Sequence, residues 1–160
     1  MEDALFGPQT QRAVENFTIS VRPLPWPFIR ALARIKQAAA ETNAALGLLD
    51  REISEAIRDA AGDIARGAHG DQFPVPVFQT GSGTSTNMNV NEVICGIAGN
   101  RGVKLSANDH VNLGQSSNDV IPTAMCLSTA EGLQFLLEPA LARLAVSIRQ
   151  KAEEYGDVIK

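Results

Sequence analysis

The stretch "GSGTSTNMNVNE" (81–92) places two glycines, three asparagines and four hydroxyl side chains directly before an apolar segment. Its asparagines alternate with apolar residues, which taken alone would predict a strand. A helix accounts for the stretch better, because Thr84, Asn87 and Asn91 then fall at i, i+3 and i+7 on one polar stripe. Serine and threonine just before such a helix suit its N-cap. We therefore predict a helix whose polar face begins at its N-terminus.

Two amphipathic helices are predicted upstream of this stretch. From about Pro27 onward, apolar residues recur at steps of three and four, the spacing of a helix that buries one face. Asp50 suits the N-cap of a second helix, and Gly67 suits its end. The apolar positions are Phe28, Leu32, Ile35, Ala39, Leu46 and Leu49 in the first helix, and Ile53, Ile57, Ala61 and Ile64 in the second. The pair is expected to form a helical hairpin.

Three segments are expected to be irregular. Residues 1–25 lack a clear period and contain several prolines, so they are interpreted as an arm. Residues 69–83 form a connection rich in glycine and proline, and residues 99–117 have the composition of a loop.

A long helix is predicted after residue 117. Asn118 or Asp119 suits its cap, and Pro122 is acceptable if it lies in the first turn. Helical spacing continues to Tyr155, with a break or kink at Glu138-Pro139. The apolar positions there are Leu133, Leu136, Leu137, Leu141, Leu144 and Ile148. The sequence thus predicts an all-α fold.

Composition excludes several classes of protein. The chain has 160 residues, 44% of them hydrophobic and 20% charged, as in soluble globular proteins. A net charge of −4 without a basic patch argues against nucleic acid. The N-terminus has no signal core, and no apolar run approaches the roughly 18 residues of a membrane span. Cys95 and Cys126 lie in apolar contexts, which predicts buried free thiols in a cytoplasmic protein.

Two loops carry the pattern of an anion site. "GSGTSTN" and "GQSSND" each place small hydroxyl and amide side chains at the start of a predicted helix. The free N–H groups at a helix N-terminus favour an anion there. Facing each other, the loops would suit a small dicarboxylate or a phosphate. Clusters of serine, threonine and asparagine before helices are more often simply helix caps. His69 and His110 share no motif and are interpreted as surface or structural residues. No P-loop or dinucleotide motif is present.

Two longer segments resemble a known family. "VFQTGSGTSTNMNVNEVI" (77–94) and "NDHVNLGQSSNDVIPTAM" (108–125) resemble the first two signature regions of class II fumarate hydratase, in the fumarase/aspartase superfamily. "ALFGPQTQRAVENF" (4–17) looks like the N-terminal segment of that family. The resemblance implies a helical N-terminal domain over residues 1–115 and the truncated start of a long helical bundle over residues 116–160.

The resemblance also implies an activity and a site. The family hydrates fumarate reversibly to L-malate without a metal or organic cofactor, in a homotetramer whose active sites combine three subunits. By position, the substrate-binding residues would be Ser82, Gly83, Thr84, Ser116, Ser117 and Asn118. Relatives that deaminate aspartate read G-A-G-T and Q-S-T-N-D, so Ser82 and Ser117 favour fumarase. A secondary dicarboxylate site would fall on Ser106, Ala107, Asn108 and Asp109, where the family has His-Pro-Asn-Asp.

No residue of the chain matches the family's catalytic segments. The Thr-His segment and the Gly-Ser-Ser loop are both absent, so no catalytic residue is assigned and the chain alone is expected to be inactive. Its expected partners are a small dicarboxylate and either copies of itself or a complementary C-terminal chain. The alternatives are a non-catalytic dicarboxylate-binding module, an oligomerisation fragment that uses the apolar stripe of residues 133–148, and a relative that acts on aspartate or argininosuccinate.

Overall fold

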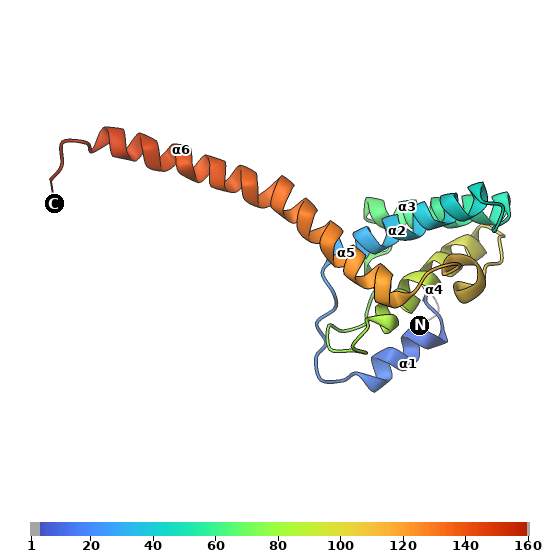
Figure 1. The fold of residues 1–160 in the computed structure, drawn as a ribbon. Helices are drawn as coiled ribbons and strands as arrows, with labels where there is room; N and C mark the ends of the chain where they lie inside the picture. The colour runs from blue at the N-terminus through green and yellow to red at the C-terminus, as the bar shows by residue number, and fades with distance from the viewer. Residues whose placement is uncertain (1–3, 160) are drawn as a thin grey trace.

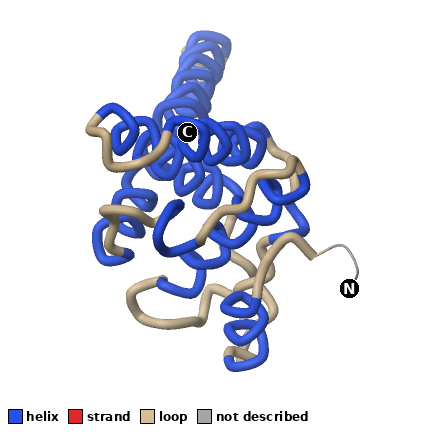
Figure 2. Tube along the Cα trace, turned by 90° about the vertical axis from the view of Figure 1, so that its right-hand side faces the viewer, coloured by secondary structure: helices blue, strands red, loops and turns tan. Residues whose placement is uncertain are grey.

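The structure is a computed structural model that describes residues 4–159. Those residues form α-helices and short helical turns, with no strand beyond an isolated bridge between Pro23 and Pro76 (Figure 2). The predicted all-α class is confirmed. The elements are α1 (Pro8–Asn16), α2 (Trp26–Ala45), α3 (Arg51–Arg66), η1 (Gly70–Gln72), α4 (Thr84–Asn100), η2 (Ala107–Val111), α5 (Ser117–Gly132), η3 (Leu133–Leu137) and α6 (Glu138–Glu154).

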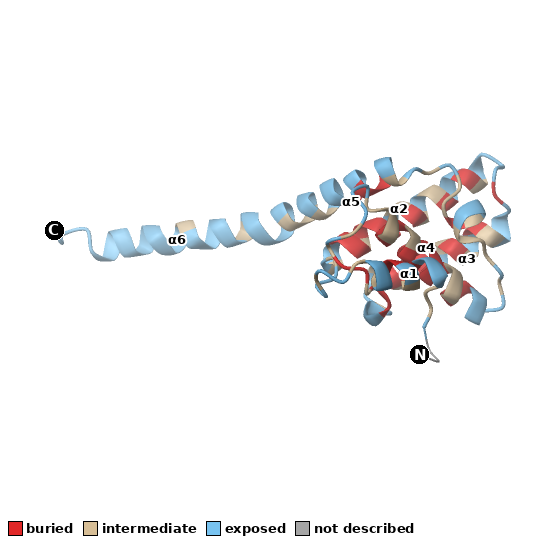
Figure 3. Ribbon diagram, turned by 90° about the horizontal axis from the view of Figure 1, so that it is seen from below, coloured by how far each residue is buried: buried red, intermediate tan, exposed pale blue. Residues whose placement is uncertain are grey.

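A helical body carries one long projecting helix (Figure 1). Helices α2 and α3 pack side by side as the predicted hairpin, and α4 contacts α1, α2, α3 and α5. The chain continues without interruption from α5 through η3 into α6, which extends away from the body. Buried residues lie in the body and at the start of α5, whereas α6 has none (Figure 3).

The hairpin differs from its predicted core in one respect. Gly67 ends α3 in the left-handed conformation, with φ of 110°, as expected. In α2, however, Leu46 is 67% exposed, while Lys36 is completely buried and Asn43 is nearly so. The buried face of α2 is therefore rotated from the predicted apolar stripe toward these two polar residues.

The prediction of an irregular N-terminal arm is wrong in part, because residues 8–16 form α1. The carboxylate of Glu92, on α4, accepts hydrogen bonds from the backbone N–H groups of Gly7, Gln9 and Thr10 at 3.0, 2.9 and 2.9 Å. It also accepts one from Thr10 Oγ1 at 2.6 Å. A negative charge among the free N–H groups of a first turn stabilises the helix. The arm is thus helical because a distant side chain caps it.

The helix starts also differ from the predicted caps. Gly83, with φ of 66°, occupies the N-cap position of α4, and Gln79 Oε1 accepts from the Thr86 N–H at 3.0 Å. At α5 the cap is Ser116, whose Oγ accepts from the Asn118 N–H at 3.2 Å, instead of Asn118 or Asp119. Starting α5 at Ser117 puts Pro122 inside the helix, beyond its first turn.

The break expected at Glu138-Pro139 is a π-helical turn, η3, within a continuous helix. Proline has no N–H for the bond to the residue four positions earlier, and a local π adjustment accommodates that loss. The whole helix, Ser117–Glu154, has 38 residues and a window of mean hydropathy 1.3, long and apolar enough by composition to cross a membrane. A helix that packs against other helices meets the same criterion.

The predicted burial of the thiols is corrected for Cys126, which is exposed on α5 because that helix leaves the body. Cys95, on α4, is half-buried. Burial raises the pKa of the Cys95 thiol to about 11, with a further contribution from the negative charge of Glu92. Neither cysteine forms a disulfide.

The capping of α1 by Glu92 can be tested with Glu92→Gln. The amide has one acceptor oxygen and turns N–H groups toward the donors, so the free energy of unfolding should fall by about 2–3 kcal/mol. Urea unfolding measures this change, and hydrogen exchange should show α1 losing protection first. Glu15→Gln, at an exposed position of α1, is the control. Equal protection of α1 in both variants would contradict the assignment.

Candidate functional site

The starts of α4 and α5 are joined by a short chain of hydroxyl groups. Thr84 Oγ1 lies 2.9 Å from Ser117 Oγ, and Ser82 Oγ lies 2.8 Å from Thr84 Oγ1. Residues 33 positions apart in sequence thus come into direct contact. The structure brings together these three residues of the predicted substrate site.

Gly83 allows this approach. Its φ of 66° suits glycine, and a Cβ there would lie 3.0 Å from the side chain of Ile121, on α5. A larger residue would be strained at this φ and would require the Ile121 side chain to shift by a few tenths of an ångström. Of the remaining predicted residues, Ser116 uses its hydroxyl oxygen to cap α5, and Asn118 is exposed beside it.

The electrostatics of this site favour an anion. The N-termini of two helices, 17 and 16 residues long, meet at the Thr84–Ser117 contact. Each brings the positive end of its helix dipole, which favours negative charge. Side-chain oxygens already accept from the Ser85, Thr86 and Asn118 N–H groups. The hydroxyl groups of Ser82, Thr84 and Ser117 add neutral donors. This arrangement can bind a carboxylate but supplies no group that titrates near neutral pH.

A buried polar cluster lies behind the two loops, and the sequence analysis did not identify it. Lys36 Nζ donates to Asn112 Oδ1 and to Gln115 Oε1, each at 2.9 Å. Asn112 Oδ1 also accepts from Asn87 Nδ2 at 3.0 Å and from Asn91 Nδ2 at 3.2 Å. The predicted stripe of Asn87 and Asn91 therefore points to this cluster rather than to solvent.

Lys36 is completely buried, and none of the ion pairs of the described residues includes it. Burial lowers the pKa of Lys36 from 10.5 to about 7. The signal that could have revealed it is its position in helix α2, four residues after Leu32 and four before Ala40, on the buried face. A lysine on an apolar face is usually interpreted as solvated, which is why it was missed.

The predicted secondary site is internally bonded. Ser106 Oγ donates to Asp109 Oδ2 at 2.6 Å and accepts from the Asp109 N–H at 3.1 Å. Ala107 and Asn108 lie in the π turn η2, and His110 Nδ1 accepts from the Ser106 N–H at 3.1 Å. His110 is therefore structural, as predicted, whereas the exposed His69 has a positive φ of 61°. The secondary site stays a prediction.

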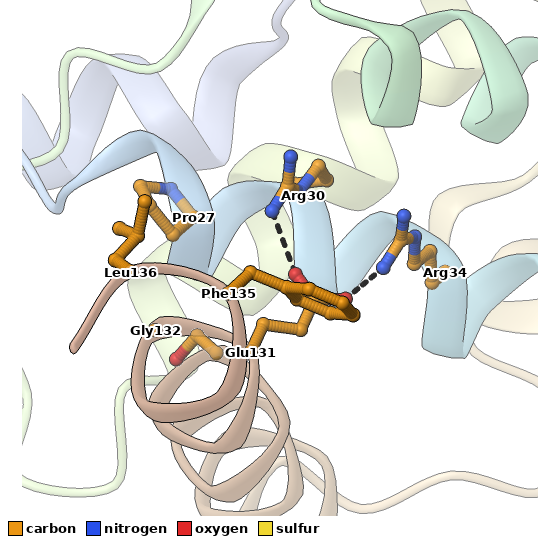
Figure 4. Close-up of a pocket in the computed structure, with 8 residues that line it drawn as sticks. Pro27, Arg30, Arg34, Glu131, Gly132, Phe135 and Leu136 are labelled. Atoms are coloured by element: carbon orange, nitrogen blue, oxygen red, sulfur yellow. Dashed lines mark hydrogen bonds and ion pairs between the residues drawn. The ribbon is translucent and has the colours of Figure 1, made fainter. Parts of the chain in front are cut away.

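A recess of about 720 Å³ lies away from these loops, where α2 meets the end of α5 (Figure 4). Glu131 forms ion pairs with both Arg30 and Arg34, at 2.7 Å for Arg30. Phe135 and Leu136 close one side of the recess. The carboxylate of Glu131 and the two guanidinium groups in the recess are thus paired with one another. No group of three or more metal-ligating side chains occurs between residues 4 and 159.

The chain matches the lyase family over residues 1–160 and belongs to it. It is similar to proteins named class II fumarate hydratase. The Xylella fastidiosa protein is 53% identical over 99% of this chain, and the Mycobacterium tuberculosis protein is 53% identical over 98%. The chain spans 34% and 33% of the lengths of these two relatives. The predicted resemblance to an N-terminal segment of class II fumarate hydratases is confirmed.

Solved structures agree with the sequence relatives. Class II fumarase from Schistosoma mansoni superposes with a TM-score of 0.91 and 40% identity, over 95% of this chain and 34% of that one. A Brucella melitensis protein described as fumarate lyase:delta crystallin superposes with a TM-score of 0.93 and 43% identity, over 99% of this chain and 39% of that one.

The low pKa of Lys36 predicts a pH dependence of stability. Between about pH 7 and pH 10 the unfolded chain holds a proton at Lys36 that the folded chain releases, so this residue makes stability rise with pH. This contribution of Lys36 to the free energy of unfolding disappears as the pH falls toward 7. Relative to Lys36→Met, the wild-type free energy of unfolding should rise by up to about 1.4 kcal/mol per pH unit.

Urea titrations of both proteins at pH 7, 8 and 9 measure this difference. Cys95 is present in both proteins, so its titration cancels in the comparison. A difference that does not change with pH would show that Lys36 keeps an ordinary pKa in the folded chain.

Proposed function

We propose that this chain is the substrate-binding N-terminal part of a fumarate hydratase, which catalyses the reversible hydration of fumarate to L-malate once the rest of the enzyme completes it. The contact between Thr84 Oγ1 and Ser117 Oγ carries this proposal. It joins the two loops that resemble the family's substrate-binding segments. The identity of about 50% to proteins named class II fumarate hydratase supports the same activity.

The chemistry follows from the donors at the two helix starts. Ser82, Gly83 and Thr84 would bind one part of the dicarboxylate, and Ser116, Ser117 and Asn118 the other. When a proton leaves the substrate carbon, the adjacent carboxylate becomes a dianion, and fixed neutral donors stabilise that added charge. Hydroxyl and amide groups are poor general acids and bases at neutral pH. Proton transfer is therefore assigned to groups other than these donors.

The wider proposal is that of a cytoplasmic enzyme of the tricarboxylic acid cycle. Residues 1–115 would form the N-terminal domain and residues 116–160 the start of the bundle. The complete enzyme would be a homotetramer that uses no cofactor, and Ser106–Asp109 would form its secondary dicarboxylate site. We infer that the apolar helix packs against protein rather than a membrane. Aspartate remains the alternative substrate, which Ser82 and Ser117 disfavour.

Two substitutions test the dicarboxylate site. Thr84→Ala removes the hydroxyl that meets Ser117, and Asn118→Ala removes an exposed amide without changing the cap. Each should weaken fumarate binding about tenfold, the loss of one hydrogen bond to a charged group. Calorimetric titration measures the dissociation constant. Ser147→Ala, which removes a hydroxyl on α6, should leave it unchanged. Unchanged affinity in both site variants would reduce the two loops to helix caps.

A second function, association, is favoured by the apolar surface of η3 and α6. Leu136 is 70% exposed, Leu141 54%, Leu144 55% and Ile148 60%. Contiguous apolar surface of this kind marks an interface or an aggregation site. The alternative of an oligomerisation fragment depends on this surface. A non-catalytic binding module would instead keep only the dicarboxylate site, and both alternatives lack turnover.

Complementation separates an enzyme segment from these alternatives. The pure chain should form no malate, but it should become active when mixed with a separately expressed fumarase remainder that begins at the Thr-His segment. Leu141→Asp with Leu144→Asp should abolish this gain by charging the apolar face, whereas the control Gln150→Asp should not. Fumarate absorbance follows the reaction. Activity of the chain alone would overturn the proposal, and a folded but inactive mixture would favour the non-catalytic alternatives.

A further inference from the structure

The buried cluster around Lys36 connects to both sides of the Thr84–Ser117 contact. On one side, Lys36 binds Gln115, the residue directly before Ser116 and Ser117. On the other, it binds Asn112, whose Oδ1 also accepts from Asn87, one helical turn after Thr84. The two hydroxyls that meet at the candidate site are therefore each linked to one buried amino group.

The loop between these points is held by several further bonds. Asn112 Nδ2 donates to the Gln115 carbonyl at 3.0 Å, and Gln115 Nε2 donates to the Val111 carbonyl at 2.9 Å. These bonds stay within the loop and fix its shape. The bonds from Lys36 are different, because they attach that shape to α2.

The energetic cost of this arrangement argues for a role beyond stability. A lysine in the core loses its hydration, and none of the ion pairs among residues 4–159 includes Lys36. An apolar residue of similar volume usually stabilises a core at least as well as a buried charge. Asn87 and Asn91 also keep buried Oδ1 atoms without a hydrogen-bond partner while their amide groups face Asn112. The cluster holds a specific geometry at the expense of stability.

We propose that Lys36 is a positioning residue for the dicarboxylate site: by binding Asn112 and Gln115 it holds the loop before α5 against α4, so that Ser117 stays within hydrogen-bond distance of Thr84. This role rests on the proposed function of the two loops. Lys36 itself does not touch the substrate. It sets the separation between donors that do.

A double-mutant cycle tests the role. Lys36→Met removes the amino group and keeps the stem. Gln115→Met removes one of its two loop partners, together with the bonds from Gln115 to the Val111 and Leu113 carbonyls. Ser54→Ala is the control, because it deletes another buried bond of the hairpin, from Ser54 Oγ to the Ala40 carbonyl at 2.9 Å, with no link to the loop.

Two readouts are needed, the dissociation constant for fumarate and hydrogen exchange at the Asn118 and Val120 amides, which bond to Ser116. Each single variant should raise both the constant and the exchange rates about tenfold. The double variant should change each readout by clearly less than the two single effects combined, because the Lys36–Gln115 bond is lost in both single variants. Ser54→Ala should change both readouts less than twofold, even if its melting temperature falls as far as those of the Lys36 and Gln115 variants.

The outcomes separate the positioning role from the proposed function. If fumarate binds and neither Lys36→Met nor Gln115→Met changes binding or loop exchange, the positioning role is wrong and the dicarboxylate site stands. Additive effects in the double variant would also contradict it. If the wild-type chain binds no fumarate, the proposed site fails, and loop exchange alone decides whether Lys36 holds the loop.

Discussion

A single side-chain oxygen, Asn112 Oδ1, connects three parts of the body that are far apart in sequence. It accepts hydrogen bonds from Lys36 of α2 and from Asn87 and Asn91 of α4, while its own residue belongs to the loop before α5. Apolar contacts are non-directional. Hydrogen bonds that converge on one atom are directional, so they fix how the helix starts lie relative to one another. The candidate site depends on that relation.

The sequence predicts the helices better than their ends. Periodicity placed α2 and α3 correctly, because each buries one face and the spacing of its apolar residues records it. Helix α4 is buried on nearly all sides, and the helical spacing of its polar residues identified it instead. It missed α1, whose stability comes from Glu92, more than 80 residues away in sequence. The N-caps of α4 and α5 were misplaced because serine, threonine and asparagine are adjacent there, and only the backbone path decides which of them caps.

The sequence named the polar residues of the candidate site but not the contacts between them. The two polar loops stand out in the sequence, and their resemblance to one family pairs them. The hydroxyl contact between them is visible only in the folded chain, as is the buried lysine behind them. The register of Lys36 with Leu32 and Ala40 is the one local signal of its burial, and the usual preference of lysine for solvent argues against interpreting it so. Such conflicts between local preference and fold are expected at functional sites.

The π turn η3 changes the direction in which the long helix presents its side chains beyond residue 137. Each residue that such a turn inserts rotates the following face by about 100° around the axis. The face of α5 that packs on α2 is therefore out of phase with the apolar positions of α6. One continuous helix can then pack against the body through one face and against a different neighbour through another. Proline at residue 139 makes this change of phase a fixed part of the chain.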